Sequence, residues 1–232
     1  MIELIQTEEE AIKLTKQLMA YSRRYTGAEL DFINIVNAFN KLAPHGNHGS
    51  RLFAALIDLK FNFTLLLIDS FNSGAIWNAQ NAISFSEEKD ILENYELFEK
   101  RFDIHKHDAN YIPRYRAIWD KIMGILLLFA SEEVYEKYNS SKSRKKAFRT
   151  LSKNVEFLTD EFVENVLKHM QDFDDSFRTG EMHRFGSLRK YSFLKSPHDK
   201  REYILLKNSW NYLLGILTEI DRLIADIKDE TL

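Results

Sequence analysis

The sequence contains no cysteine and few residues that form turns. Only 8 glycines and 3 prolines occur among 232 residues, whereas average usage would make these two residue types about 12% of a chain. So few turn-forming residues cannot easily connect many short strands, which argues against sandwiches, barrels and multi-strand α/β folds. The absence of cysteine excludes a disulfide framework, a Cys-ligated metal site and a thiol nucleophile. We therefore expect long helices and a chemistry limited to histidine, arginine and carboxylates.

Long apolar runs are also absent from the sequence. The longest unbroken one, Ile122 to Ala130, is far shorter than the roughly 18 residues that a membrane-spanning helix needs. We interpret it as part of a buried core helix and expect no association with a membrane. The first ten residues lack the basic and apolar regions of a secretory signal. These features predict a cytoplasmic protein.

The residues that are abundant favour a packed helical core. The chain has 17 phenylalanines and 10 tyrosines, and 44% of it is hydrophobic, which is sufficient to build a core. We predict an all-α fold, a single bundle-like domain over residues 1–232 with about seven to nine helices and a long aperiodic loop at residues 174–195. Capping signals and apolar spacing predict helices over residues 7–25, 28–42, 51–71, 75–83, 84–101, 113–138, 152–173 and 197–228, with a polar loop at 102–110.

Basic residues are concentrated in two segments although the net charge of the chain is only -3. Residues 137–153 contain seven basic and no acidic side chains, and residues 178–207 contain eight basic and three acidic ones. This segregation is typical of a local site for a polyanion, although basic segments also occur as solvated helix faces. The predicted nucleic-acid-binding residues are Arg144, Lys145, Lys146, Arg149, Arg184, Arg189, Lys190 and Tyr191.

The aperiodic stretch is the strongest candidate for a functional segment. Loops of about twenty residues are uncommon in compact domains and often carry function. Its mixture of arginine, histidine and aromatic residues suits phosphate neutralisation and base stacking. In the alternative interpretation, the aromatic residues dock the loop onto the bundle while its bases pair with Asp172, Asp174 and Asp175. The adjacent Asp174 and Asp175 are themselves interpreted as helix-end charges.

One short motif within this stretch resembles a known family. Residues 178–183, Arg-Thr-Gly-Glu-Met-His, fit the Arg-x(4 to 6)-His pattern of the HEPN superfamily (higher eukaryotes and prokaryotes nucleotide-binding). Together with Arg116-Ala-Ile-Trp-Asp-Lys121, the residues around this motif resemble a bacterial, poorly characterised HEPN-like group. The resemblance covers two short blocks of the chain. The same spacing recurs from Arg101 to His107, without the basic, aromatic and aperiodic context of the first motif.

The resemblance implies an all-α protein that binds or processes nucleic acid, RNA rather than DNA, as a metal-independent endoribonuclease without a cofactor. It assigns general acid-base catalysis to His183 and stabilisation of phosphate charge to Arg178. It also implies a homodimer that brings two motifs together. Thr179 and Gly180 depart from the usual family pattern, so binding without catalysis remains an alternative. The competing class is a non-catalytic helical interaction module that binds a protein partner.

Two further groups of residues were considered as sites. His105 and His107 could share a metal ion only on an extended segment, because side chains two residues apart diverge on a helix. A solvated loop is the favoured interpretation, and we predict no metal site. Arg116 and Asp120 are four residues apart on a predicted helix and are expected to form a structural ion pair beside a core residue, Trp119.

Overall fold

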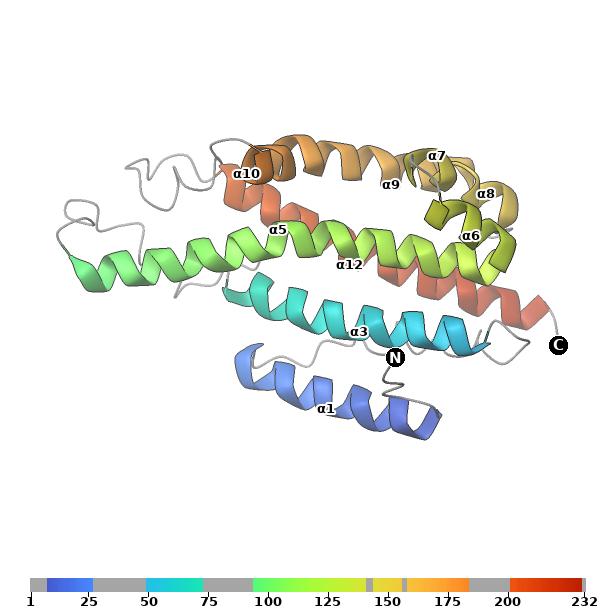
Figure 1. Ribbon diagram of the computed structural model, residues 1–232, viewed down its shortest axis with the longest axis horizontal. Helices are drawn as coiled ribbons and strands as arrows, with labels where there is room; N and C mark the ends of the chain where they lie inside the picture. The colour runs from blue at the N-terminus through green and yellow to red at the C-terminus, as the bar shows by residue number, and fades with distance from the viewer. Residues whose placement is uncertain are drawn as a thin grey trace. The chain divides into compact units, whose positions relative to one another are not determined.

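The structure is a computed structural model that describes residues 8–26, 49–72, 94–140, 144–155, 158–183 and 201–230. These residues form helices and contain no strand (Figure 1). The predicted all-α class is therefore confirmed. The helices predicted over residues 28–42 and 75–83 lie outside the described residues, so the number of helices in the whole chain stays a prediction.

Four long helices contain most of the described residues: α1 (Glu8–Thr26), α3 (Gly49–Asn72), α5 (Tyr95–Ala130) and α12 (Arg201–Glu230). The shorter elements are α6 (Glu132–Ser140), α7 (Arg144–Phe148), α8 (Leu151–Asn154), α9 (Asp160–Phe173), the π-helix η2 (Asp174–Arg178) and α10 (Thr179–His183). Helices α1 and α3 confirm those predicted over residues 7–25 and 51–71. Helix α12 confirms the one predicted over residues 197–228, whose first four residues lie outside the described part of the chain.

The chain divides into two compact units, each assembled from segments that are distant in sequence. Unit 1 consists of residues 1–64, 117–170 and 215–232, and unit 2 of residues 65–116 and 171–214. Helices α3, α5, α9 and α12 contribute residues to both units. Each unit is described by itself below, and the predicted single domain stays a prediction.

The core of unit 1 is built on the apolar run of α5. All residues from 122 to 128 are buried, which confirms the predicted core helix for the part of the run whose side chains are described. Burying a large aliphatic side chain contributes about 1.5–3 kcal/mol, so this run holds the unit together. Among the described residues, no helix has the length and hydropathy needed to cross a membrane. Other core side chains are Leu56, Leu59, Phe63, Phe148, Leu151, Val163, Val166, Met170, Leu217 and Ile220.

The core of unit 2 combines aromatic packing with buried hydrogen bonds. The Tyr115 hydroxyl donates to the backbone oxygen of Ser209 at 2.7 Å, and the Tyr111 hydroxyl lies 3.1 Å from the Ser209 side-chain oxygen. Burial raises the pKa of Tyr111 well above its usual range. The rings of Tyr115 and Phe173 pack together with centroids 4.4 Å apart. The ring of Phe173 also packs against that of Phe177, with centroids 5.2 Å apart. These contacts attach α12 and the η2 region to α5.

Helix α5 corrects the prediction of two helices separated by a polar loop at residues 102–110. It is a continuous α-helix of 36 residues that contains Pro113. Proline within a helix removes one hydrogen bond and costs about 3 kcal/mol. Tyr111, Ile112 and Tyr115 are fully buried around it, and burial of three large side chains exceeds that cost. Tertiary packing therefore overrides the local breaking signal.

Two predicted helices are interrupted where the sequence analysis expected them to continue. Helix α5 ends at Ala130, and the side chain of Ser131 accepts a hydrogen bond from the Val134 amide at 3.0 Å, which is N-cap geometry for α6. The helix predicted over residues 152–173 is broken at Val155, whose backbone is extended. Thr159 then caps α9 through a bond from the Phe162 amide at 3.1 Å. In both places a hydroxyl side chain caps the start of the next helix.

The predicted loop at residues 174–195 is wrong for its first ten residues. Residues 174–183 form η2 and α10, and residues 184–195 lie outside the described residues. A π-helical turn contains one residue more than an α-helical turn, so the apolar spacing shifts and no regular period is visible in the sequence. Phe177 is 2% exposed and anchors this segment in the core of unit 2. The aromatic residues expected to dock the loop, Phe185, Tyr191 and Phe193, lie outside the described residues.

Candidate functional site

Arg178 ends the π-helix and occupies a partly exposed position. Its Nη1 atom lies 3.7 Å from Oδ2 of Asp174, one turn earlier. The arginine side chain is 48% exposed, whereas that of Asp174 is only 14% exposed. At this distance the two groups form an ion pair without a hydrogen bond, and about half of the arginine side chain is accessible to solvent. This pair also confirms, for Arg178, the alternative interpretation that the bases of this segment pair with nearby acids.

Asp174 is shared by a second arginine from another helix. Nε of Arg116, on α5, donates a hydrogen bond to the same Oδ2 atom at 3.3 Å, and the Arg116 side chain is only 10% exposed. Two guanidinium groups thus adjoin one carboxylate oxygen. Trp119 is buried as predicted. The predicted pair of Arg116 with Asp120 stays a prediction.

The hydrophobic residues of the π-helix fix the position of this charge cluster. Phe177 precedes Arg178 directly and is buried against Phe173. Gln171 donates to Asp175 at 2.8 Å on the exposed side of the same segment. Because neighbouring residues point in different directions around a helix, burial of Phe177 determines where Arg178 emerges.

His183 is the last residue of α10, and its side chain is outside the described part of the structure. The intervening Thr179 and Gly180 are helical, so the two motif positions belong to one helical run. Positions five apart lie about 140° from each other around a regular α-helix. In a regular α-helix the two positions would therefore lie on different sides.

The predicted nucleic-acid-binding residues are divided among the parts of the chain. Arg144, Lys145 and Lys146 are on α7 in unit 1, and Lys146 is exposed. The exposed Arg149 follows them, and its Nε donates to Glu164 at 3.0 Å. This segment belongs to unit 1, whereas Arg178 belongs to unit 2. The other predicted residues, Arg184, Arg189, Lys190 and Tyr191, lie outside the described residues.

The second arginine-histidine match and the histidine cluster lie on α5 rather than in a loop. Nδ1 of His107 lies 3.1 Å from Oδ1 of Asp69, and Nε of Arg114 donates to Oδ2 of Asp69 at 3.0 Å. Asp69 is nearly buried, so this carboxylate attaches α3 to α5 within unit 2. On a helix His105 and His107 diverge. In the described ranges, no group of three or more metal-ligating side chains comes together.

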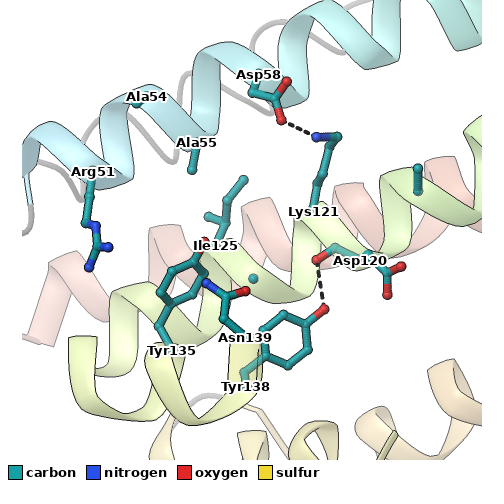
Figure 2. Close-up of a pocket in the computed structure, with 12 residues that line it drawn as sticks. Arg51, Ala54, Ala55, Asp58, Asp120, Lys121, Ile125, Tyr135, Tyr138 and Asn139 are labelled. Atoms are coloured by element: carbon teal, nitrogen blue, oxygen red, sulfur yellow. Dashed lines mark hydrogen bonds and ion pairs between the residues drawn. The ribbon is translucent and has the colours of Figure 1, made fainter. Parts of the chain in front are cut away.

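Unit 1 contains a cavity of about 480 Å³ that sequence analysis did not predict. Its walls include Ala54 and Ala55 of α3, Gly124 and Ile125 of α5, and Tyr135 and Asn139 of α6. Figure 2 shows Ala55 and Asn139 directed into this space from opposite sides. No linear motif contains these residues, since they come from three helices. The only sequence signal was the presence of small residues on helix faces otherwise occupied by large ones.

Ion pairs bound this cavity at both ends. At one end Arg51 of α3 binds two carboxylates of α6, those of Glu132 and, at 2.8 Å, Glu136. The hydrogen bond to Glu132 and, to a smaller extent, the one to Glu136 raise the pKa of Arg51. At the other end Lys121 of α5 binds Asp58 of α3 (Figure 2). These ion pairs therefore connect the three helices that line the cavity, which is open to solvent on one side.

A buried lysine on α3 was also missed by sequence analysis. Lys60 is 4% exposed, and its Nζ donates to the Thr15 hydroxyl of α1 at 3.1 Å. Burial lowers the pKa of Lys60 to about 8. In the sequence Lys60 lies between apolar neighbours of α3. Its long aliphatic stem can pack with the apolar side chains on the inward face of this helix.

The comparisons with known proteins do not identify a family for this chain. No protein-family model matches it, and no match was found among the curated proteins or the solved structures.

Proposed function

We propose that this protein binds single-stranded nucleic acid, RNA in preference to DNA, and cleaves RNA without a metal ion at Arg178 and His183. The observation that carries the proposal is the position of Arg178. Its side chain is about half exposed, lies 3.7 Å from the Asp174 carboxylate and is located at the end of a π-helical turn. Such turns occur frequently at functional sites, and an exposed guanidinium group can present its donors to a phosphate.

Cleavage would follow from proton transfer at the ribose and charge stabilisation at the phosphate. His183 accepts the proton of the 2′-hydroxyl, and the 2′-oxygen attacks phosphorus. The bond from phosphorus to the 5′-oxygen breaks, and this oxygen takes a proton from water. Arg178 stabilises the negative charge that develops on the phosphate oxygens. The products are a 2′,3′-cyclic phosphate and a 5′-hydroxyl end. Histidine suits this role because its ordinary pKa lies near neutrality.

A non-catalytic module that binds a protein partner is the second candidate. Met182, next to His183, is 55% exposed, and an exposed apolar side chain beside a charged group is common in protein interfaces. In this case the cluster around Asp174 would orient α10 for the partner rather than for a phosphate.

Incubation with single-stranded RNA in EDTA tests the proposal. The wild-type chain is expected to produce fragments with 5′-hydroxyl ends, which can be labelled directly with a kinase. Arg178→Ala and His183→Ala should remove cleavage, and matched controls, Arg222→Ala and His105→Ala, should retain it. Arg222 is an exposed arginine that is also paired with a carboxylate on its own helix, so it controls for loss of one surface charge.

Binding to RNA is measured separately from cleavage. Each phosphate that a protein neutralises on a single strand contributes about -0.7 to the slope of log affinity against log salt. Arg178→Ala should reduce the size of this slope by about that amount. The proposal is wrong if the wild-type chain neither cleaves RNA nor binds RNA or DNA in a salt-dependent manner.

A further inference from the structure

We infer that Arg116 is a positioning residue for Arg178, because it binds the Asp174 carboxylate and thereby leaves the donors of Arg178 available to a phosphate. The three side chains come from α5 and η2 and belong to unit 2. The inference rests on the proposed function and adds to it a residue that acts without contacting RNA. Two distances at one carboxylate oxygen and the burial of Arg116 support it.

The packing of α5 holds Arg116 against Asp174. The Arg116 side chain is only 10% exposed. The preceding residue, Tyr115, is fully buried, and its ring centroid lies 4.4 Å from that of Phe173. Phe173 directly precedes Asp174 in the chain. Two successive residues of α5 therefore contact two successive residues where α9 continues into η2, and this double contact fixes the position of the carboxylate.

Asp174 binds Arg116 more closely than it binds Arg178. Nε of Arg116 donates to Oδ2 at 3.3 Å, whereas Nη1 of Arg178 lies 3.7 Å from the same oxygen. The longer distance is that of an ion pair without a hydrogen bond. A phosphate can therefore approach the exposed side chain of Arg178 without first breaking a hydrogen bond to the carboxylate.

Removal of Arg116 would change what the Asp174 carboxylate binds. In the part of the chain that the structure describes, Oδ1 of Asp174 is buried and accepts no hydrogen bond, so the carboxylate can take a further donor. Arg178 is four residues away on the same helical run, a spacing at which opposite charges attract. Without its nearer cation, the carboxylate would draw Arg178 into a hydrogen-bonded pair and compete with a phosphate for the same donors.

Chemical labelling of arginine in the full chain, without RNA, tests the inference. Phenylglyoxal reacts with accessible guanidinium groups, and mass spectrometry gives the rate at Arg178 relative to that at the exposed Arg222 of the same sample. In Arg116→Met we expect labelling of Arg178 to slow by about two- to fivefold, which corresponds to the strength of a partly exposed ion pair. Arg114→Met is the matched control and should leave the rate unchanged. Arg114 also lies on α5 and donates to a carboxylate through Nε, but this carboxylate is Asp69.

A double variant separates a positioning role from a structural one. Asp174→Asn removes the charge that would hold Arg178, so its combination with Arg116→Met should restore labelling at least to the wild-type rate. RNA binding is measured on samples of these variants whose circular dichroism shows that they are folded. Arg116→Met should reduce the size of the salt slope by about 0.7, as Arg178→Ala does, and should add nothing in the Arg178→Ala background. A substitution that only destabilised the fold would not depend on Arg178 in this way.

Two conservative variants and the labelling result decide between the outcomes. Arg116→Lys keeps a cation beside Asp174 and should retain wild-type labelling and RNA binding. Arg116→Gln keeps a donor there, and it replaces Arg116→Met, with the same expected direction, if that variant does not fold. If Arg178 is labelled at the wild-type rate after loss of the Arg116 charge, the inference is overturned. If labelling slows as expected but the wild-type chain neither binds nor cleaves RNA, Arg116 still positions Arg178 and only the proposed function is wrong.

Discussion

Replacement of Lys60 by methionine is expected to stabilise the protein at neutral pH. Methionine has a similar length and no charge, so it can occupy the same buried position between α1 and α3. Lys60 is 4% exposed, and its hydrogen bond to the Thr15 hydroxyl, a neutral group, does not balance the charge. The wild-type chain must either bury an ammonium group or release its proton on folding.

The magnitude follows from the difference in pKa between the folded and unfolded states. The pKa of Lys60 is about 8 in the folded protein, compared with an ordinary value of 10.5. Each unit of difference corresponds to about 1.4 kcal/mol, so the buried ammonium costs up to about 3 kcal/mol at pH 7. Loss of the bond to Thr15 costs about 1 kcal/mol. The net expectation is a stabilisation of about 2 kcal/mol.

The effect must depend on pH with a defined sign. Because the folded state holds the proton less tightly than the unfolded state, the stability of the wild-type chain rises with pH between about 8 and 10.5. The methionine variant lacks this titration. Its advantage should be largest below pH 8 and should fall to about zero near pH 10, where the remaining charge penalty of about 1 kcal/mol is offset by the lost hydrogen bond.

Urea unfolding of the wild type and Lys60→Met at pH 7, 8.5 and 10 measures this difference. Lys168→Met, at an exposed position on α9, is the matched control and should show no such pH dependence. In thermal unfolding, 2 kcal/mol should raise Tm by about 4–8 °C for a chain of this length. A variant that is less stable than the wild type at pH 7, or whose difference stays constant up to pH 10, would refute the reasoning.

Three other outcomes are expected. Asp174→Asn removes the charge shared by two arginines, one of them nearly buried, and should cost about 2–3 kcal/mol in urea unfolding, whereas Glu164→Gln in an exposed pair should leave the midpoint unchanged. Gly180→Ala should stabilise the chain by up to about 1 kcal/mol in thermal unfolding, since the helix there has open space for a Cβ; a lower Tm would contradict this. If the active site combines Arg178 of one chain with His183 of another, an equal mixture of Arg178→Ala and His183→Ala chains should recover about a quarter of wild-type RNA cleavage, and no recovery would exclude such a shared site.

Helices with regular apolar spacing could be predicted from the sequence, whereas helix continuity could not. The predicted and observed ranges agree for α1, α3 and α12, whose apolar residues recur at three- and four-residue intervals. Pro113 is a strong local signal for a helix start, yet α5 passes through it because its neighbours pack on both sides. Local propensity is a weak prior where tertiary burial is large. The sequence shows the proline but not the surface against which Tyr111 and Tyr115 pack.

In the candidate sites, contacts within one helix could likewise be predicted from the sequence, whereas contacts between distant segments could not. The pair between Arg178 and Asp174 spans one helical turn, and it was among the alternatives derived from the sequence. The second partner, Arg116, is 58 residues away, and no periodicity in one segment indicates a contact over that separation. The cavity of unit 1 was invisible for the same reason, since its walls come from three helices.

Asp174 and Asp175 show why a pair of identical neighbours can have different roles. Both were interpreted as helix-end charges, but Asp174 faces Arg116 and Arg178 at low exposure, whereas Asp175 is exposed and accepts from Gln171. Successive residues in a helix point in different directions, so the rotation of η2 about its axis decides which carboxylate faces inward. That rotation is fixed by Phe177, which is buried in the core of unit 2. A core residue therefore determines which acid holds the arginine on which the proposed function depends.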